Sequence, residues 1–298
     1  TVAGCVYAHK VFVQSEKVRA TYIRVFREAF GDKFGKPEDK FVALGSPKYD
    51  KVINSRPEDF TLPADWRALL FKADGGKKKT VFYNTNISAI LAEDEAYLQK
   101  LRAVLEVFRA RAGDALLWWR PHPLNEATYR SMRPRLLGEY ERITAEYKQG
   151  GWGIFDDTPD LHRAIAWSDA YFGDWSSLVT MCQRAGKPVI IQNVKLTDCT
   201  RYLPEAEAQP ETERERVFRK DPATLKTESN CCYYERKAAR LGDYIDSLIR
   251  EGETGELSAA VARGVEIARE LNAHADGTSG REIYRYVKDL ILPGEAGP

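Results

Sequence analysis

Cysteine, histidine and excess charge are all scarce in this sequence. Its 298 residues include five cysteines and four histidines, and the formal net charge is +1. An odd number of cysteines without a C-x-x-C pair predicts neither a disulfide framework nor a zinc site, and it favours a reducing, cytoplasmic compartment. Because the net charge is close to zero and no face carries a basic stripe, we expect no nucleic-acid partner.

Long hydrophobic runs are also missing. No apolar stretch reaches the roughly 18 to 20 residues that a membrane-spanning helix needs, and the first residues lack the regions of a signal peptide. No ligand cluster supports a metal, and we expect no cofactor. The sequence starts at Thr1 and reaches a strand-like segment at 10–14 almost at once. We therefore expect it to be part of a longer protein.

What the sequence does have is an alternation of short apolar runs with amphipathic stretches. This periodicity predicts strands at 10–14, 40–47, 79–86, 115–119, 152–157, 170–173 and 188–192. It predicts helices at 15–30, 94–111, 125–148, 159–167 and 176–185. Such alternation indicates an α/β fold, a Rossmann-like parallel sheet with helices on both faces and ligands at the carboxyl ends of its strands. We expect residues 1–200 to form this one domain.

Residues 201–298 have a different composition. A stretch rich in Glu, Arg and Lys, with three prolines, runs from 204 to 230, and we expect a charged excursion on the surface. Apolar residues then recur at helical spacing in 241–249 and 257–271, and a third helix is predicted at 279–291. We expect these C-terminal helices to pack on the same domain.

The loop "RPHP" follows the fourth predicted strand and holds Arg120 and His122. A histidine in such a loop is more often a structural or surface residue than a catalytic one. The two flanking prolines nevertheless indicate fixed geometry, and an imidazole held in place can donate to a diphosphate or protonate a leaving phosphate. Arg120 can supply a permanent charge to the same anion, although arginine at a strand end is also commonly a solvated residue.

The segment "AYFGDWSSLV" places Gly173, Asp174, Ser176 and Ser177 between a predicted strand and a predicted helix. A helix start offers backbone N–H groups and the positive end of the helix dipole, so it suits a phosphate. The serine hydroxyls would add donors. The alternative, that one serine is only an N-cap, has equal weight on this local pattern.

Three further loops follow predicted strands. Each can reach a ligand, and each also has an ordinary structural interpretation. Asp156, Asp157 and Asp160 can contact a ribose or can merely cap the next helix. Gly45 and Ser46 form a small-residue loop that a ligand can approach, but they do not form a Walker motif. Asn84 and Thr85 can bind a ligand or satisfy a turn.

Taken in order, these motifs carry a resemblance to a known family. G-S-P-K-Y-D, Y-N-T-N, R-P-H-P, D-D-T-P-D and S-D-A-Y-F-G-D-W-S-S, followed by K-P-V, resemble the C-terminal half of CDP-glycerol glycerophosphotransferases of the teichoic-acid polymerase and primase type. The family segments read G-x-P-R-x-D, Y-x-P-T, R-x-H-P and T-D-Y-S-S. The resemblance covers residues 10–195. It implies a GT-B architecture, in which two Rossmann-like domains face each other across a cleft.

The resemblance also implies a function. This chain would supply the donor half of a transferase that moves glycerol phosphate from CDP-glycerol, or a related CDP-alditol such as a ribitol donor, to a hydroxyl of a cell-wall or capsule polymer and releases CMP. His122 would contact the donor diphosphate and aid the departure of CMP. Ser176 and Ser177 would grip phosphate, and Asp157 and Asp160 would lie near the nucleotide. The segments "GDWSS" and "YNTN" depart from the family pattern, which bears on the identity of the donor rather than on the fold.

In that family the base for the acceptor hydroxyl belongs to an N-terminal acceptor domain, which we expect to be missing from this sequence. We therefore expect the isolated chain to bind donor but to transfer glycerol phosphate poorly. The full-length protein is expected to be cytoplasmic and to associate peripherally with the inner face of the cell membrane.

Two other interpretations remain open. The first is a GT-B enzyme that uses another nucleotide sugar and prefers UDP or GDP to CDP. The second is a non-catalytic nucleotide-binding or interaction module, which would be indifferent to the loss of His122.

Overall fold

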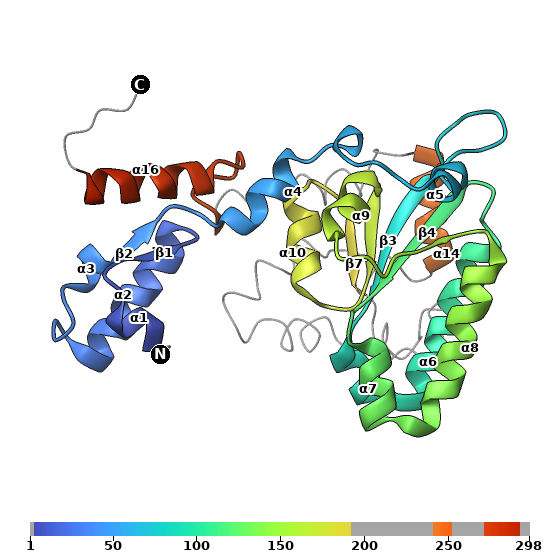
Figure 1. Cartoon of the computed structure of the whole chain (residues 1–298), viewed down its shortest axis with the longest axis horizontal. Coiled ribbons are helices and arrows are strands. Elements are labelled where there is room, and N and C mark those ends of the chain that lie inside the picture. The colour runs from blue at the N-terminus through green and yellow to red at the C-terminus, as the bar shows by residue number, and fades with distance from the viewer. Residues whose placement is uncertain (1–2, 192–240, 252–270, 293–298) are drawn as a thin grey trace, which may run out of the picture. The chain divides into compact units, whose positions relative to one another are not determined.

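The computed structural model describes residues 3–191, 241–251 and 271–292 (Figure 1). The chain divides into two compact units. Unit 1 comprises Thr1–Ser55 and Val265–Pro298, and unit 2 comprises Arg56–Gly264. This division differs from the boundary at residue 200 that we expected from the sequence. The predicted charged excursion at 204–230 and most of the predicted apolar face at 257–271 lie outside the described residues.

Unit 2 is built on a five-stranded parallel sheet with the order β5-β4-β3-β6-β7. Its strands are β3 (Lys79–Thr85), β4 (Ala115–Pro121), β5 (Ile154–Phe155), β6 (Ala170–Gly173) and β7 (Val189–Ile191). The chain moves outward from β3 to β4 and β5, and then returns to the other side of β3 for β6 and β7. The strand order therefore reverses between β3 and β6, which is where open α/β sheets form a crevice for ligands.

Helices cover both faces of this sheet, as predicted (Figure 1). One face carries α6 (Ile87–Arg109), α8 (Pro134–Gly150) and α14 (Leu241–Glu251), whose apolar residues form one core with β3, β4 and β6. The other helices among the described residues of unit 2 are α5 (Ala64–Leu69), α7 (Asn125–Met132), α9 (Leu161–Trp167) and α10 (Ser177–Arg184), with a short 3-10 turn, η2, at Pro57–Asp59. Trp66 of α5 packs edge-on against Trp118 of β4, with ring centroids 5.5 Å apart.

The predicted strands are all present within a few residues, but two helices differ from expectation. The helix expected at 125–148 is two helices, α7 and α8, because Pro134 disfavours helical geometry at Arg133. The helix expected to start at 94 instead begins at Ile87, and Asp94 lies inside it with φ 49°. Arg133 and Arg135 both pair with the Asp94 carboxylate and hold this kink in place.

Unit 1 contains a separate parallel pair, β1 (Val11–Val13) and β2 (Phe41–Ala43), which does not join the sheet of unit 2. Its helical elements are α1 (Ala3–Tyr7), α2 (Glu16–Phe30), α3 (Pro37–Lys40), the 3-10 turn η1 (Pro47–Tyr49), α4 (Asp50–Asn54) and α16 (Ser279–Ile291). Ser15 caps α2, since its Oγ accepts from the Val18 N–H at 3.3 Å. We had expected β1 and β2 to be part of the main sheet.

The C-terminal segment of unit 1 is fastened to the "GSPKYD" motif and the short helix that follows it. Ser46 N donates to Asn272 Oδ1 at 2.9 Å, and Gly280 N donates to Asp50 Oδ2 at 2.7 Å. Gly45 has φ +81°, and a Cβ there would lie 2.2 Å from the Ser279 Oγ. We call these contacts the C-terminal latch. The helix predicted at 279–291 therefore forms with the expected bounds, but it packs in unit 1, whereas α14 packs in unit 2.

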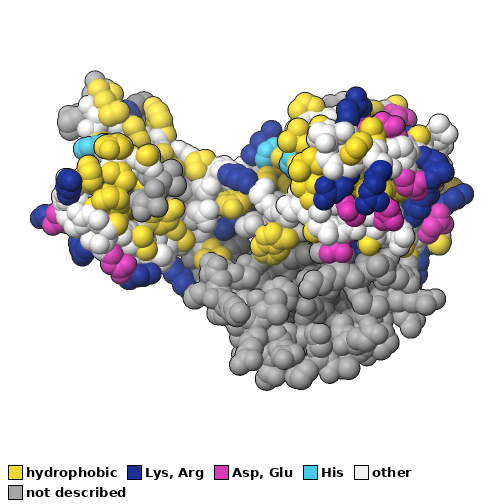
Figure 2. All heavy atoms as spheres, turned by 90° about the horizontal axis from the view of Figure 1, so that it is seen from below, with side chains coloured by type: hydrophobic (Ala, Val, Ile, Leu, Met, Phe, Trp, Pro, Cys, Tyr) yellow, Lys and Arg dark blue, Asp and Glu magenta, His cyan; other side chains and the backbone are white. Residues whose placement is uncertain are grey.

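Lys and Arg side chains of unit 2 stand among Asp and Glu side chains on the face that Figure 2 shows. Many charged side chains among the described residues are paired, as in Arg102 with Glu139 at 2.6 Å and Arg111 with Asp246 at 2.7 Å. In the part of the chain that the structure describes, no helix is both long and apolar enough to cross a bilayer.

Unit 2 is expected to lose stability at alkaline pH because its core contains buried tyrosines. Burial raises the pKa of Tyr140 to about 12 and raises the pKa values of Tyr97, Tyr129 and Tyr147 well above their usual range. The unfolded chain then releases these protons first, so the stability is fully present below about pH 10 and falls as the pH rises further. Each such tyrosine contributes a slope of about 1.4 kcal/mol per pH unit.

Urea unfolding across this pH range measures the effect. Tyr140→Phe should flatten the alkaline decline, whereas Tyr7→Phe, at a side chain that is 79% exposed, should leave it unchanged. A urea concentration at the unfolding midpoint that stays constant up to about pH 11 would contradict the prediction.

Candidate functional site

Three of the sequence-predicted residues form one row across the carboxyl edge of the sheet in unit 2. Asn84 of β3 is in register with Arg120 of β4 on one side and with Gly173 of β6 on the other. The Asn84 side chain extends this alignment, because its Nδ2 donates to the Arg120 carbonyl at 2.9 Å and its Oδ1 accepts from the Ser176 Oγ at 3.4 Å. Asn84 thus joins the end of β4 to the start of α10, at the point where the strand order reverses.

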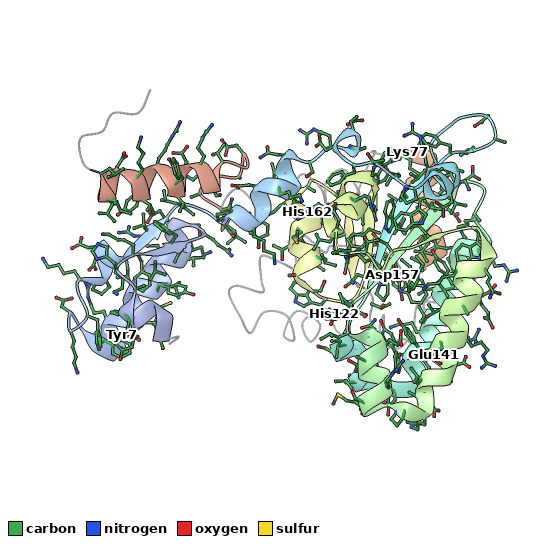
Figure 3. All side chains as sticks on the ribbon, in the orientation of Figure 1. Tyr7, Lys77, His122, Glu141, Asp157 and His162 are labelled. Atoms are coloured by element: carbon green, nitrogen blue, oxygen red, sulfur yellow. The ribbon has the colours of Figure 1, made fainter. Side chains whose placement is uncertain are left out.

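His122 lies in the loop that links β4 to α7 (Figure 3) and is half-buried. Its backbone and its ring are both hydrogen-bonded. Its N–H donates to the Thr85 carbonyl at 2.9 Å. The ring nitrogen Nδ1 accepts from the Leu124 N–H at 3.2 Å. Because Nδ1 is the acceptor, the proton of the neutral ring lies on Nε2, which makes that atom a donor.

The start of α10 uses its two serines differently. Ser176 is the N-cap, and its Oγ accepts from the Leu178 N–H at 3.2 Å while donating to Asn84. Ser177 is the first residue of the helix and is exposed. The capping role that the sequence left open therefore belongs to Ser176, and Ser177 is the serine whose hydroxyl faces solvent at the positive end of the helix dipole.

Gly173 is required by the close approach of β6 to β3. Its φ is +147°, and a Cβ at this position would lie 2.3 Å from the Asn84 carbonyl oxygen and 2.8 Å from the Asn84 nitrogen. Both obstacles are backbone atoms of the central strand, which cannot move aside as a side chain can. Only glycine can therefore end β6 in this way and start the turn toward α10.

Asp174 is buried, with 2% of its surface exposed, and it holds two loops together. Its Oδ2 accepts from the Asn86 N–H at 2.7 Å and from the Tyr97 hydroxyl at 2.5 Å. Its own N–H donates to the Asn84 carbonyl at 3.0 Å. Asp174, which we expected to contact the substrate, fixes the β6–α10 loop to α6 through these bonds.

Thr85 is likewise engaged inside the protein. Its Oγ1 accepts from the Trp119 Nε1 at 3.2 Å and from the Asn125 Nδ2 at 3.0 Å, and the residue is 1% exposed. Asn84 and Thr85 were both predicted to bind substrate. Their contacts instead make them positioning residues for the loops on either side, and Asn125, which sequence reasoning missed, belongs to the same arrangement.

Arg120 lies in a buried ionic cluster rather than facing solvent. Its Nη1 is 2.9 Å from the Asp156 Oδ1, and its Nη2 donates to the Thr158 carbonyl. Arg163 Nη2 is 3.6 Å from the same carboxylate, and its guanidinium lies 4.6 Å above the Trp66 ring. We had predicted that Arg120 would supply its charge to a substrate anion. Here its guanidinium pairs with Asp156, one of the three loop aspartates for which the sequence left capping or ribose contact open.

Asp157 and Asp160 lie in the loop after β5 and have the structural contacts that the sequence left open. Asp157 is 68% exposed in its side chain and is 3.6 Å from the Lys148 Nζ. Asp160 caps α9, because its Oδ1 accepts from the His162 N–H at 3.0 Å. Figure 3 labels Asp157 and His122, which come from the loops after the neighbouring strands β5 and β4.

Gly45 and Ser46 do not belong to this group. They lie in unit 1, where they form part of the C-terminal latch. Among the described residues, no group of three or more His, Cys, Asp or Glu side chains could hold a metal ion. The candidate site in unit 2 comprises the loops after β3, β4 and β6. His122 is half-buried and Ser177 exposed there, whereas Asn84, Asp174 and Thr85 are buried.

This architecture, with its parallel sheet, switch point and flanking helices, is that of one Rossmann-like domain of a GT-B fold. The structure of the wall teichoic acid polymerase TagF is similar to this one, with a TM-score of 0.53 at 13% identity. The match covers 95% of this chain and 59% of the TagF chain. The MnaA protein of S. aureus, solved with UDP, is also similar, with a TM-score of 0.53 at 14% identity. That match covers 99% of this chain and 64% of the MnaA chain. At such identities the likeness establishes the fold alone.

The chain spans about three fifths of the length of these solved neighbours, 59% and 64% respectively. No protein-family model matches the sequence, and no curated protein matches it either.

Proposed function

We propose that this chain binds the diphosphate of a CDP-linked alditol at the carboxyl edge of the unit 2 sheet and serves as the donor half of a glycerophosphotransferase. The observation that carries the proposal is the link from Ser176 through Asn84 to the Arg120 carbonyl, with distances of 3.4 Å and 2.9 Å. This link brings the His122 loop and the start of α10 to the two sides of β3. An imidazole donor and a helix N-terminus on either side of one strand end suit an anion.

The proposed chemistry is a phosphoryl transfer. An acceptor hydroxyl oxygen forms a bond to the phosphorus next to glycerol, the bond from that phosphorus to the oxygen bridging the two phosphates breaks, and CMP leaves with the electron pair. His122 Nε2–H donates to the departing phosphate, while the N-terminal end of α10 stabilises its growing charge. The base that takes the proton of the acceptor hydroxyl is proposed to lie outside this chain, as is the contact with the wall or capsule polymer.

The cellular setting follows from that proposal. A transferase of this kind works in the cytoplasm, at the inner face of the membrane where its polymer grows, and the full-length protein is proposed to associate with that surface peripherally. The fold likeness to a wall teichoic acid polymerase and the order of the sequence motifs support this setting.

A second candidate function is an enzyme acting on another nucleotide sugar. The observation that favours it is that the match to MnaA, which was solved with UDP, has the same TM-score, 0.53, as the match to the polymerase. The two candidates differ in the base they select, so ligand preference decides between them.

Calorimetry with CDP-glycerol, CDP, UDP and GDP tests the proposal. We expect CDP-glycerol and CDP to bind more tightly than UDP and GDP, and we expect His122→Asn to weaken their binding by about 10-fold or more. The asparagine oxygen can still accept from the Leu124 N–H, so this variant removes the imidazole but keeps the loop.

His9→Ala is the matched control, because His9 is exposed in unit 1, and it should bind as the wild type does. Tighter binding of UDP than of CDP would favour the second candidate function. Equal binding by the wild type and His122→Asn would mean that the chain binds nucleotides without using His122.

A further inference from the structure

Trp175 is exposed at the site, unlike the other tryptophans of the chain. The chain has six tryptophans, all within the described residues. Trp118 and Trp119 are fully buried, Trp66, Trp152 and Trp167 are partly buried, and Trp175 alone of the six is exposed, by 51%. Trp175 immediately precedes the N-cap of α10, beside the strand-order reversal.

The exposure of Trp175 does not come from a loose loop. Its carbonyl oxygen accepts from the Asn86 Nδ2 at 3.0 Å. The residue before it, Asp174, is buried and bonded to α6, and the residue after it, Ser176, is bonded to Asn84. The backbone on both sides of the indole is therefore fixed, so the ring is presented to solvent at a defined place.

A second apolar side chain is presented on the neighbouring loop. Leu124 is 55% exposed, and its N–H is bonded to the His122 ring. The strands that lead to Leu124 and Trp175 are the two neighbours of β3, so the loops start about 10 Å apart. The two groups proposed to bind the phosphates, His122 and the start of α10, thus each lie beside an exposed apolar side chain. A diphosphate alone would not cover these apolar side chains.

We propose that Trp175 is the stacking platform for the nucleobase of the bound nucleoside diphosphate. The inference rests on the proposed function, because it takes the phosphates to lie at the start of α10. Stacking on an indole is favourable for any base, since every base has a π-face. Trp175 therefore supplies affinity for nucleoside diphosphates in general, and the choice of one base depends on other groups.

The test compares wild type, Trp175→Ala and Trp175→Phe in binding CDP, UDP and inorganic pyrophosphate. We expect Trp175→Ala to weaken CDP and UDP by the same factor, about 10- to 100-fold, and to leave pyrophosphate unchanged. Trp175→Phe should retain most of the affinity. CDP should also quench tryptophan fluorescence in the wild type, and the quenching should be absent in Trp175→Phe. Met132→Ala, at another exposed apolar residue of unit 2, is the control.

The outcomes distinguish a failure of base stacking on Trp175 from a failure of the proposed function. If Trp175→Ala binds CDP as the wild type does, or loses pyrophosphate as strongly as it loses CDP, the stacking role is overturned while diphosphate binding stands. If the wild type binds neither nucleotides nor pyrophosphate, the proposed function fails and the stacking role fails with it.

Discussion

Replacing Asp156 with alanine is expected to lower the free energy of unfolding of unit 2 by about 3 to 5 kcal/mol. The Asp156 carboxylate is fully buried and lies within 2.9 Å of the Arg120 guanidinium and 3.6 Å of the Arg163 guanidinium. It also accepts from the Trp118 Nε1 at 3.0 Å and from the Thr158 Oγ1 at 2.6 Å. Removing it leaves two largely buried cations without their shared anion, which is the most costly way to break an ionic cluster.

The neighbouring carboxylate provides a matched control. Asp157→Ala removes a charge from the next residue, but that side chain is 68% exposed and 3.6 Å from Lys148, so the change in unfolding free energy should stay below about 1 kcal/mol. Chemical unfolding of both variants measures the difference. Equal, small effects from the two substitutions would mean that the cluster does not hold the β4 and β5 ends in place.

Replacing Gly173 with alanine is expected to destabilise unit 2 by about 3 kcal/mol or more, through two effects that add. The first is a collision, since the new Cβ would lie 2.3 Å from the Asn84 carbonyl oxygen. The second is backbone strain, because φ at this residue is +147°. Relieving the collision would shift Asn84 away from Gly173 and disturb the hydrogen bond between Asn84 and Ser176. Nucleotide binding should therefore weaken even where the protein remains folded.

Gly186→Ala separates the two effects. Gly186 has φ +71°, but a Cβ there would meet no atom within 4 Å, so only the strain of about 1 to 2 kcal/mol remains. Thermal and urea unfolding of both variants, with CDP binding measured on the folded fraction, gives the comparison. Similar losses in the two variants would show that β6 can move away from β3 at little cost.

The strands could be predicted from the sequence because buried parallel strands are short, continuous apolar runs, as in the "ALLWW" segment of β4. The partners of the polar residues that follow those strands could not. Asn84 was predicted to reach a ligand, but its side chain bonds to residues 36 and 92 positions away in the sequence. Which strands become neighbours is decided by tertiary packing, and local periodicity carries no information about it.

The two helices that differ from the prediction do so for different reasons. The break at Arg133 was readable, because Pro134 is a local signal. The kink at Asp94 was not, because the residues that hold it, Arg133 and Arg135, lie 39 and 41 positions further along the chain. Likewise, the capping role of Ser176 was one of two alternatives in the sequence, whereas the pairing of Arg120 with Asp156 needed the neighbouring strand to be known.

The C-terminal latch means that unit 1 can be completed only late in the synthesis of this protein. Unit 2 lies in the sequence between the two segments of unit 1, and the Ser46 and Asn272 partners are separated by 226 positions. At typical ribosomal speeds, about 10 to 45 s pass between the appearance of these two residues. Residues 3–55 therefore wait, without their latch partners, while the whole of unit 2 emerges and can fold. An early segment that stays incomplete for so long is a natural target for chaperones during translation.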